Sequence, residues 1–359
     1  MDAGHLRQGK ITDEREISSA DPVARAGHPC HVCFRHGGHI GDLSPENPVY
    51  DGKMRAFLEE FHAEAGRALV DRERELELAL CCLIAEGNLL IEDTPGVGKT
   101  TLVKTVARLL GLDFKRVQFT NDLLPADILG SQIFDAARQT FSFHRGPIFA
   151  QLVLGDELNR ASARTQSAVL QAMDEHEVTI EGQTHALPEP FFFFGTQNPR
   201  DHAGTAPLPE SQVDRFLMRI ELGVPVRNTQ RKLLERDAGG AFDFTSLRVL
   251  ASPDRLLAWQ KEASGIHVSG AVSEYILNLL EAAHSRGWML SPRAGLGLQR
   301  ASRALALIRG RKHVLPDDVQ EVFLPVVIHR LAQFAAETGG AREAAKMGRA
   351  LIQAVPVRR

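Results

Sequence analysis

The chain has 359 residues, of which 43% are hydrophobic, a share that supports a globular core and argues against disorder throughout. Its formal net charge of -3 gives no support to a broad nucleic-acid-binding surface, because such surfaces are usually strongly basic. Four cysteines do not indicate a disulfide framework, which fits a cytoplasmic location.

Residues 1–53 differ in composition from the rest of the chain. They are rich in Gly, His, Pro and charged residues without helical or strand periodicity, so we expect a flexible N-terminal extension. They contain no apolar segment typical of a secretory signal, and no apolar run in the chain approaches the roughly 20 residues that cross a bilayer. An alternative interpretation is that translation starts at Met54, directly before the first helical pattern.

A group of cysteines and histidines in this extension has ligand types that suit zinc. The group comprises Cys30, Cys33, His36 and His39. Its spacing is tighter than in common zinc fingers and no predicted element surrounds it, so a zinc site and a metal-free tail both remain open. By contrast, Cys81 and Cys82 fall in an apolar helical stretch and are expected in the core.

The folded part of the chain begins with two predicted helices, near residues 54–65 and 76–83. Residues 88–92 predict a buried strand, and residues 100–110 predict a helix with one apolar stripe. A strand, a glycine-containing loop and a helix in this order begin a parallel α/β sheet.

Further strands are predicted at residues 114–119, 151–154 and 191–194, which favours a doubly wound parallel sheet over residues 54–227. Residues 228–359 are mostly helical in pattern, so we expect a separate helical domain there. Within it, Pro316 followed by two aspartates indicates a helix start.

The loop between the strand at 88–92 and the next helix has the composition of a phosphate-binding loop. Gly96 and Gly98 permit the tight turn that aims backbone N–H groups at one point. Lys99 would reach the β- and γ-phosphates of ATP, and the Thr100 hydroxyl would bind Mg²⁺. The predicted nucleotide contacts are Asp93, Thr94, Pro95, Gly96, Val97, Gly98, Lys99, Thr100 and Thr101. The alternative is a glycine turn that joins two elements by chance and binds no phosphate.

Asp93 departs from the general pattern G-x-x-x-x-G-K-[ST], in which a glycine stands at this position. Aspartate visits left-handed backbone conformations more readily than most residues, so we expect Asp93 to preserve the turn in that way.

Polar residues at two predicted strand ends suit ATP hydrolysis. Asp156 would bind Mg²⁺, and Glu157 would orient and deprotonate the attacking water. Asn198, which ends the strand at 191–194, would position the same water. The alternatives are a solvated strand end and an Asn-Pro turn.

Arg215 and Arg293 are candidates for stabilising charge at the γ-phosphate. Residue chemistry alone does not single them out among 42 Lys and Arg, and a surface arginine is the default interpretation of each.

From about residue 70 to about residue 335 the chain resembles the MoxR family of AAA+ ATPases. The motifs that carry the resemblance are EDTPGVGKT (92–100), DLLPADILG (122–130), GPIFA (146–150), DELNRA (156–161), GTQNP (195–199), LPE (208–210), DRF (214–216) and SPRA (291–294). Gly155 and Leu158 stand where Ala and Ile are commoner in the family, and neither change is expected to affect ligands.

The resemblance implies an AAA+ αβα core with a parallel sheet, followed by a smaller all-helical lid domain. Asn198 would be sensor 1, Arg293 sensor 2 and Arg215 an arginine finger that acts across the subunit interface of a ring, usually a hexamer. The family also implies a chaperone or maturation role on protein clients and a partner with a von Willebrand factor A domain.

Two β-hairpins are predicted inside the core, at residues 133–143 and 178–186, by alternation and turn composition. In related ring ATPases such hairpins face the pore or a partner; a structural extension of the sheet is the alternative.

The sequence therefore predicts Mg²⁺-dependent ATP hydrolysis coupled to conformational work on protein clients. One alternative is a nucleotide-regulated binding module without turnover, against which Glu157, Asn198 and Arg215 argue. The other is a nucleic-acid-associated motor, which the mildly acidic charge disfavours.

Overall fold

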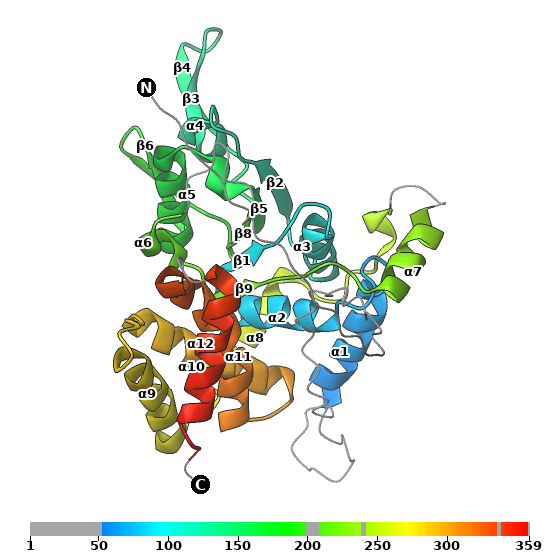
Figure 1. Cartoon of the computed structure of the whole chain (residues 1–359). Coiled ribbons are helices and arrows are strands. Elements are labelled where there is room, and N and C mark those ends of the chain that lie inside the picture. Colours follow the sequence, from blue (N-terminus) through cyan, green and yellow to red (C-terminus); the bar gives the residue numbers. More distant parts are fainter. Residues whose placement is uncertain (1–51, 199–207, 238–241, 336–338, 358–359) are drawn as a thin grey trace, which may run out of the picture. The chain divides into compact units, whose positions relative to one another are not determined.

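Five parallel strands form the main sheet, in the spatial order β2-β5-β8-β1-β9 (Figure 1). Their bounds are β1 Leu89–Glu92, β2 Phe114–Gln118, β5 Leu152–Asp156, β8 Phe192–Gln197 and β9 Met218–Ile220. The four strands predicted from the sequence are present, which confirms the parallel α/β core. Strand β9 has no counterpart in the prediction.

The computed structural model describes residues 52–198, 208–237, 242–335 and 339–357. The predicted extension at residues 1–53 lies outside the described residues except for its last two positions, and so do Cys30, Cys33, His36 and His39. The described residues belong to one unit, Asn47–Arg359.

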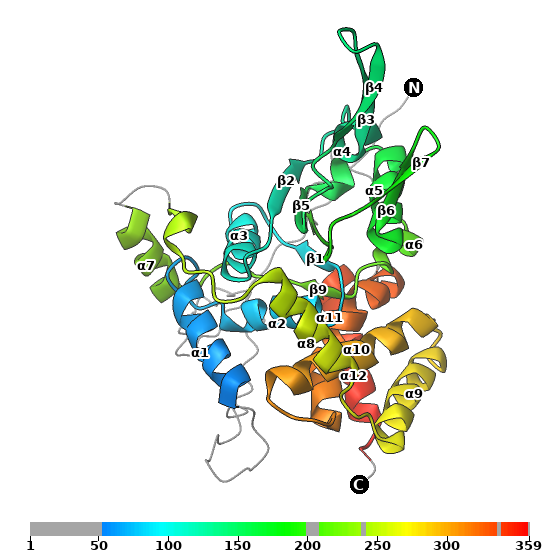
Figure 2. The same ribbon diagram turned by 180° about the vertical axis from the view of Figure 1, so that it is seen from behind.

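The side chains of each central strand alternate between two apolar layers, as strand geometry requires. Leu89 and Ile91 pack with α2 (Glu73–Ile84) and α3 (Lys99–Leu109), whereas Leu90 packs with α5 (Ala163–Glu175). Helices α3 and α5 consequently lie on opposite faces of the sheet, as Figures 1 and 2 both show. The expected αβα layering is confirmed.

The remaining helices of the core are short or precede the first strand in the sequence. They are α1 Gly52–Ala65, α4 Pro125–Leu129, the 3-10 helix η1 Leu158–Arg160 and α6 Glu210–Val213. Cys81 and Cys82 are fully buried in α2, as expected, and burial raises the pKa of both thiols.

After β9, the regular elements of the described residues are all helices, apart from an isolated β-bridge between His267 and His313. Their bounds are α7 Arg227–Asp237, η2 Phe244–Ser246, α8 Pro253–Ser264, α9 Gly270–His284, α10 Pro292–Ile308, α11 Pro316–Leu331, η3 Ala332–Ala335 and α12 Gly340–Ala354. Helix α11 begins at the predicted Pro316 and packs on β9. One apolar core includes residues on both sides of position 227, so the division into domains 54–227 and 228–359 stays a prediction. None of the described helices combines the length and hydropathy that a membrane span requires.

Both predicted hairpins are present. The first pairs β3 (Gly130–Asp135) with β4 (Thr140–Arg145), and the second pairs β6 (Glu177–Ile180) with β7 (Gln183–Ala186). The rings of Phe143 and His185 stack with centroids 4.1 Å apart, so the hairpins contact each other. The first hairpin exposes an aromatic pair, Phe134 and Phe141, whose centroids are 5.1 Å apart.

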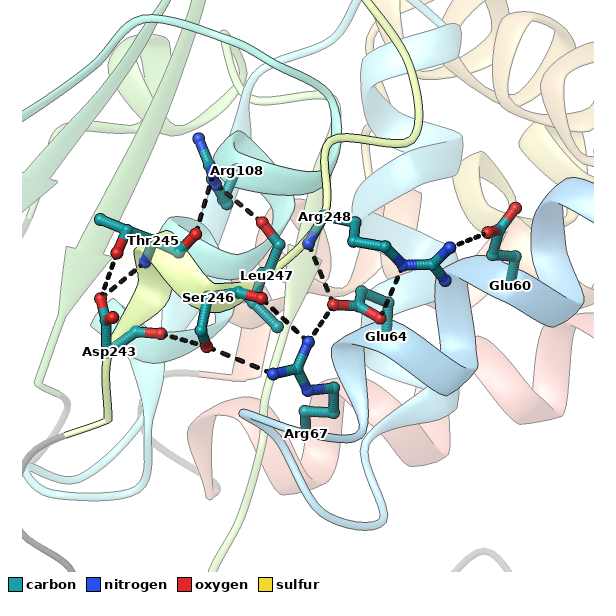
Figure 3. Close-up of polar contacts among 9 residues, drawn as sticks. All are labelled: Glu60, Glu64, Arg67, Arg108, Asp243, Thr245, Ser246, Leu247 and Arg248. Atoms are coloured by element: carbon teal, nitrogen blue, oxygen red, sulfur yellow. Dashed lines mark hydrogen bonds and ion pairs between the residues drawn. The ribbon is translucent and has the colours of Figure 1, made fainter.

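A carboxylate of α1 binds the segment that leads to α8 (Figure 3). Glu64 is buried and accepts hydrogen bonds from the backbone N–H of Arg248 at 3.0 Å, from its Nε at 3.4 Å, and from Arg67. The backbone hydrogen bond from Arg248 is the main cause of the lowered pKa of Glu64. We call Glu64, Arg67 and Arg248 the Glu64 cluster.

The C-terminal end of α3 binds the same segment. Arg108 donates from Nε to the Leu247 carbonyl and from Nη2 to the Thr245 carbonyl, each at 3.0 Å (Figure 3). Helix α3 is thus held both at its first turn, which begins at the glycine loop, and at its last turn.

The first prediction concerns Gly155 in β5. A Cβ at this position would lie 2.3 Å from Cζ of Phe193 and 2.9 Å from Cε2 of Phe119, both fully buried. Overpacking a core costs about 1–3 kcal/mol, so Gly155→Ala is expected to lower the free energy of unfolding by roughly that amount, measured by urea denaturation. Gly270→Ala is the control, because apart from its chain neighbours and the backbone of its own helix nothing lies within 4 Å of its Cβ position. A Gly155→Ala protein as stable as the parent would contradict the packing described here.

Candidate nucleotide site

The loop between β1 and α3 has the tight turn that phosphate binding requires. Gly96 has a φ of 82° and Gly98 a φ of 99°, values that residues with a Cβ rarely adopt. Gly98 is the residue directly before α3, so the positive end of that helix faces the loop. The expected strand, glycine turn and helix are confirmed.

Asp93 preserves the turn in a way that differs from the expectation. It is absent from the described residues with positive φ, so the predicted left-handed conformation is wrong. Its carboxylate instead accepts hydrogen bonds from the backbone N–H groups of Thr94 at 2.7 Å and Gly223 at 2.5 Å. Asp93 therefore holds the first residues of the loop through its side chain and joins them to the segment after β9.

Lys99 lies at the first turn of α3 and is partly buried. Its Nζ donates to the backbone carbonyls of Asp93 at 2.5 Å and Thr94 at 3.1 Å. Desolvation lowers the pKa of Lys99, while the charges of Asp93, Asp156 and Glu157 act in the opposite direction. The ammonium group therefore sits over the loop with acidic groups around it.

A cavity of about 380 Å³ opens beside this loop. It is lined by Pro95, Gly96, Gly98, Lys99, Thr100, Thr101, Arg116, Gln118, Asp156, Glu157 and Asn198. Its volume falls within the roughly 300–1,000 Å³ of small-molecule sites. The structure thus brings the loop, both predicted acids and Asn198 together, which is the arrangement that a nucleoside triphosphate requires. Asp93, Thr94 and Val97 belong to the loop without lining the cavity.

A threonine that sequence reasoning did not select positions both acids. Thr196 of β8 is fully buried, and its hydroxyl donates to Asp156 Oδ1 at 2.6 Å. The same hydroxyl accepts from the backbone N–H of Glu157 at 3.0 Å. Glu157 has a φ of 57°, a strained left-handed conformation, and its carboxylate pairs with Arg160 at 2.8 Å.

Arg116 of β2 is a second residue that the sequence analysis missed. Its Nη2 lies 2.6 Å from Oδ2 of Asp156, and it lines the cavity. The signal in the sequence was weak: Arg116 and Gln118 lie on the same side of a predicted strand, but the order of the strands that sets β2 beside β5 is not visible in the sequence.

The structure does not bring the two predicted γ-phosphate arginines to this cavity. Arg215 and Arg293 are absent from its lining, and both side chains reach Asp174 on α5. A role for either at the nucleotide of its own chain therefore has no support from this geometry.

Known proteins resemble this chain over most of its length. The model of the AAA ATPase family (ATPases associated with various cellular activities) matches residues 88–218, and that of the AAA lid domain matches residues 281–349. The chain is 38% identical to chaperone MoxR1 of Mycobacterium tuberculosis over 313 residues, which is 82% of each chain. It is also 38% identical over 286 residues to the protein YeaC of Bacillus subtilis, covering 77% of this chain and 89% of that one.

A crystal structure of an ATPase candidate from Cytophaga hutchinsonii matches with a TM-score of 0.77 at 31% identity, covering 86% of this chain and 96% of that one. The glycine loop with its lysine, the acids at the end of β5 and the helical lid define an ATPase of the AAA+ class. Within that class the chain belongs to the MoxR family.

Proposed function

We propose that this ATPase couples Mg²⁺-dependent hydrolysis of ATP to conformational work on protein clients. The observation that carries the proposal is the single cavity that gathers Lys99, Asp156, Glu157 and Asn198. The chaperone role is supported by the name of the M. tuberculosis relative.

The predicted binding and catalytic residues that line the cavity have roles that their positions support. The backbone N–H groups of the loop and Lys99 would hold the β- and γ-phosphates. Glu157 would accept the proton of the attacking water, and Asn198 would orient that water. Thr100 and Asp156 offer the hydroxyl and carboxylate oxygens that Mg²⁺ prefers, and both line the cavity. The metal, when bound, neutralises charge on the phosphates.

Glu157→Gln tests this proposal. The amide keeps the shape of the carboxylate but cannot accept the proton, so ATP hydrolysis is expected to fall by about 10²-fold or more while ATP affinity stays within about threefold. Lys99→Ala is the matched control, because losing the loop cation should abolish binding itself. Phosphate release and binding of a fluorescent ATP analogue measure the two effects. Normal hydrolysis by the Glu157→Gln protein would refute the assignment of the base.

The same pair of variants tests the client role. The Glu157→Gln protein with ATP is expected to retain proteins during affinity capture that the Lys99→Ala protein does not retain, as identified by mass spectrometry. Identical captures from both variants would contradict ATP-dependent client binding.

Arg116 offers a test of the metal ligand. It pairs with the carboxylate proposed to bind Mg²⁺, and partly exposed ion pairs are worth about 0.2–1 kcal/mol. Arg116→Ala is therefore expected to lower the Mg²⁺ concentration for half-maximal hydrolysis by up to about fivefold. Lys115→Ala, an exposed position on the same strand, is the control. A higher Mg²⁺ requirement in Arg116→Ala would instead show that Arg116 helps to bind the nucleotide.

We also propose that the protein acts as a ring, with a hexamer expected, in which Arg215 is the arginine finger of a neighbouring copy. The proposal is supported by the position of Arg215 outside the cavity of its own chain. Arg293, predicted as sensor 2, lies with it and would act at the same place. The exposed Phe134 and Phe141 of the first hairpin offer a contact surface for a client or for a partner with a von Willebrand factor A domain.

Mixing two impaired chains tests the ring. Arg215→Ala should bind ATP but hydrolyse it at least tenfold more slowly, because an arginine finger contributes about 10³–10⁵ in rate. Mixed with Glu157→Gln, which keeps its finger, the Arg215→Ala chain should regain hydrolysis in rings that contain both. The rate of phosphate release from co-expressed, doubly purified rings measures the recovery, and no recovery would exclude a finger supplied in trans.

A further inference from the structure

Asp174 forms ion pairs with both predicted γ-phosphate arginines, neither of which lines the cavity. Nη1 of Arg215 lies 2.8 Å from Oδ2 of Asp174, and Nη2 of Arg293 lies 3.5 Å from the same oxygen. Arg215 comes from the segment before β9 and Arg293 from the first turn of α10, so Asp174 joins residues 78 positions apart (293 minus 215).

We propose that Asp174 is the positioning residue of the arginine finger. It would hold Arg215, with Arg293 beside it, where the guanidinium group can enter the nucleotide cavity of a neighbouring copy. This inference rests on the proposed trans action of Arg215.

The contacts of Arg215 fix the direction of its side chain and leave part of it exposed to a neighbouring copy. Arg215 also donates from Nη1 to the carbonyl of Leu170 at 2.9 Å, one turn earlier on α5. About 31% of the Arg215 side chain and 48% of the Arg293 side chain stay exposed. Two guanidinium groups share one carboxylate, so these three side chains keep a charge of +1 that an anionic phosphate can meet.

The backbone beside both arginines is fixed independently. Asp214, directly before Arg215, accepts hydrogen bonds from the Ser291 hydroxyl at 3.1 Å and from Nε of Arg330 at 2.6 Å. Arg330 is almost fully buried in α11. Ser291 precedes Arg293 by two residues, so the contacts of Asp214 position the backbone near both arginines. Asp174 in turn positions the guanidinium groups at the ends of their side chains.

Helix α5 also connects this position to the hydrolysis site of its own chain. It begins shortly after Glu157 and η1, and it ends directly before the β6–β7 hairpin. A shift of α5 with nucleotide state in one copy would therefore move the finger that this copy presents to the next one.

Asp174→Asn is the test variant because it removes the charge and keeps the shape. Glu175→Gln is the matched control, since Glu175 is an exposed neighbour on the same helix that bonds Gln171. Misplacing a catalytic group by about 1 Å can cost about 10²-fold, so a tenfold to hundredfold loss of hydrolysis is expected, with ATP affinity unchanged. Asp174→Glu should restore part of the rate.

Mixed rings separate positioning from a structural role. In rings of Glu157→Gln and Arg215→Ala chains, the Glu157→Gln copy donates the finger and the Arg215→Ala copy hydrolyses ATP. Asp174→Asn should lower the recovered hydrolysis by the same tenfold to hundredfold when placed in the Glu157→Gln chain and leave it unchanged when placed in the Arg215→Ala chain. Thermal unfolding of each ring checks that both placements are equally stable.

The outcomes distinguish this inference from the proposal beneath it. Loss in both placements, or in neither, would overturn the role of Asp174 and leave the trans finger standing. Absence of recovered hydrolysis in the parent mixture would overturn the trans finger and the role of Asp174 together.

Discussion

The site depends on the parallel pairing of β5, β8 and β1. In this register Gly155 lies opposite Gly195, and Glu92 lies opposite Gln197, so the carboxyl ends of the three strands reach one edge of the sheet. The glycine loop, the acidic pair and Asn198 follow those strand ends directly, although they come from segments far apart in the chain. An antiparallel strand among the three would carry its polar residues to the opposite edge and leave the cavity without one of its walls.

The two acids at that edge are paired with side chains from β2, β8 and η1. Asp156 receives Thr196 from β8 and Arg116 from β2, and Glu157 receives Arg160. Buried acids are costly unless they are paired or hydrogen-bonded, so these partners allow two carboxylates to stand side by side next to Lys99. The protein can therefore keep a concentrated acidic site while the sheet beneath it stays apolar.

The strands and the glycine loop could be predicted because they depend on patterns of neighbouring residues in the sequence. Apolar runs gave the four main strands, and the spacing of Gly98 and Lys99 gave the loop. Strand β9 was not predicted because it has only three residues, with the charged Arg219 in the middle. The burial of Arg219 is compensated by an ion pair with Glu92 at 2.6 Å.

The roles of Thr196 and Asp174 could not be predicted, because they depend on which strands and helices become neighbours in the fold. Asp93 was misjudged because its hydrogen bonds, and not its backbone preference, decide its conformation.

The Glu64 cluster bears on how such proteins can be recombined. The segment before α8 is held by side chains of α1 and α3 that bind its backbone carbonyls and N–H groups, with no strand pairing to help. A lid taken from a relative would present the same backbone groups, but it would replace the Arg248 side chain, which pairs with Glu60 and Glu64 of α1. A chimera that exchanges the lid would therefore need an arginine at position 248 or the α1 of the same relative, because Glu64 of α1 and Arg248 are complementary partners.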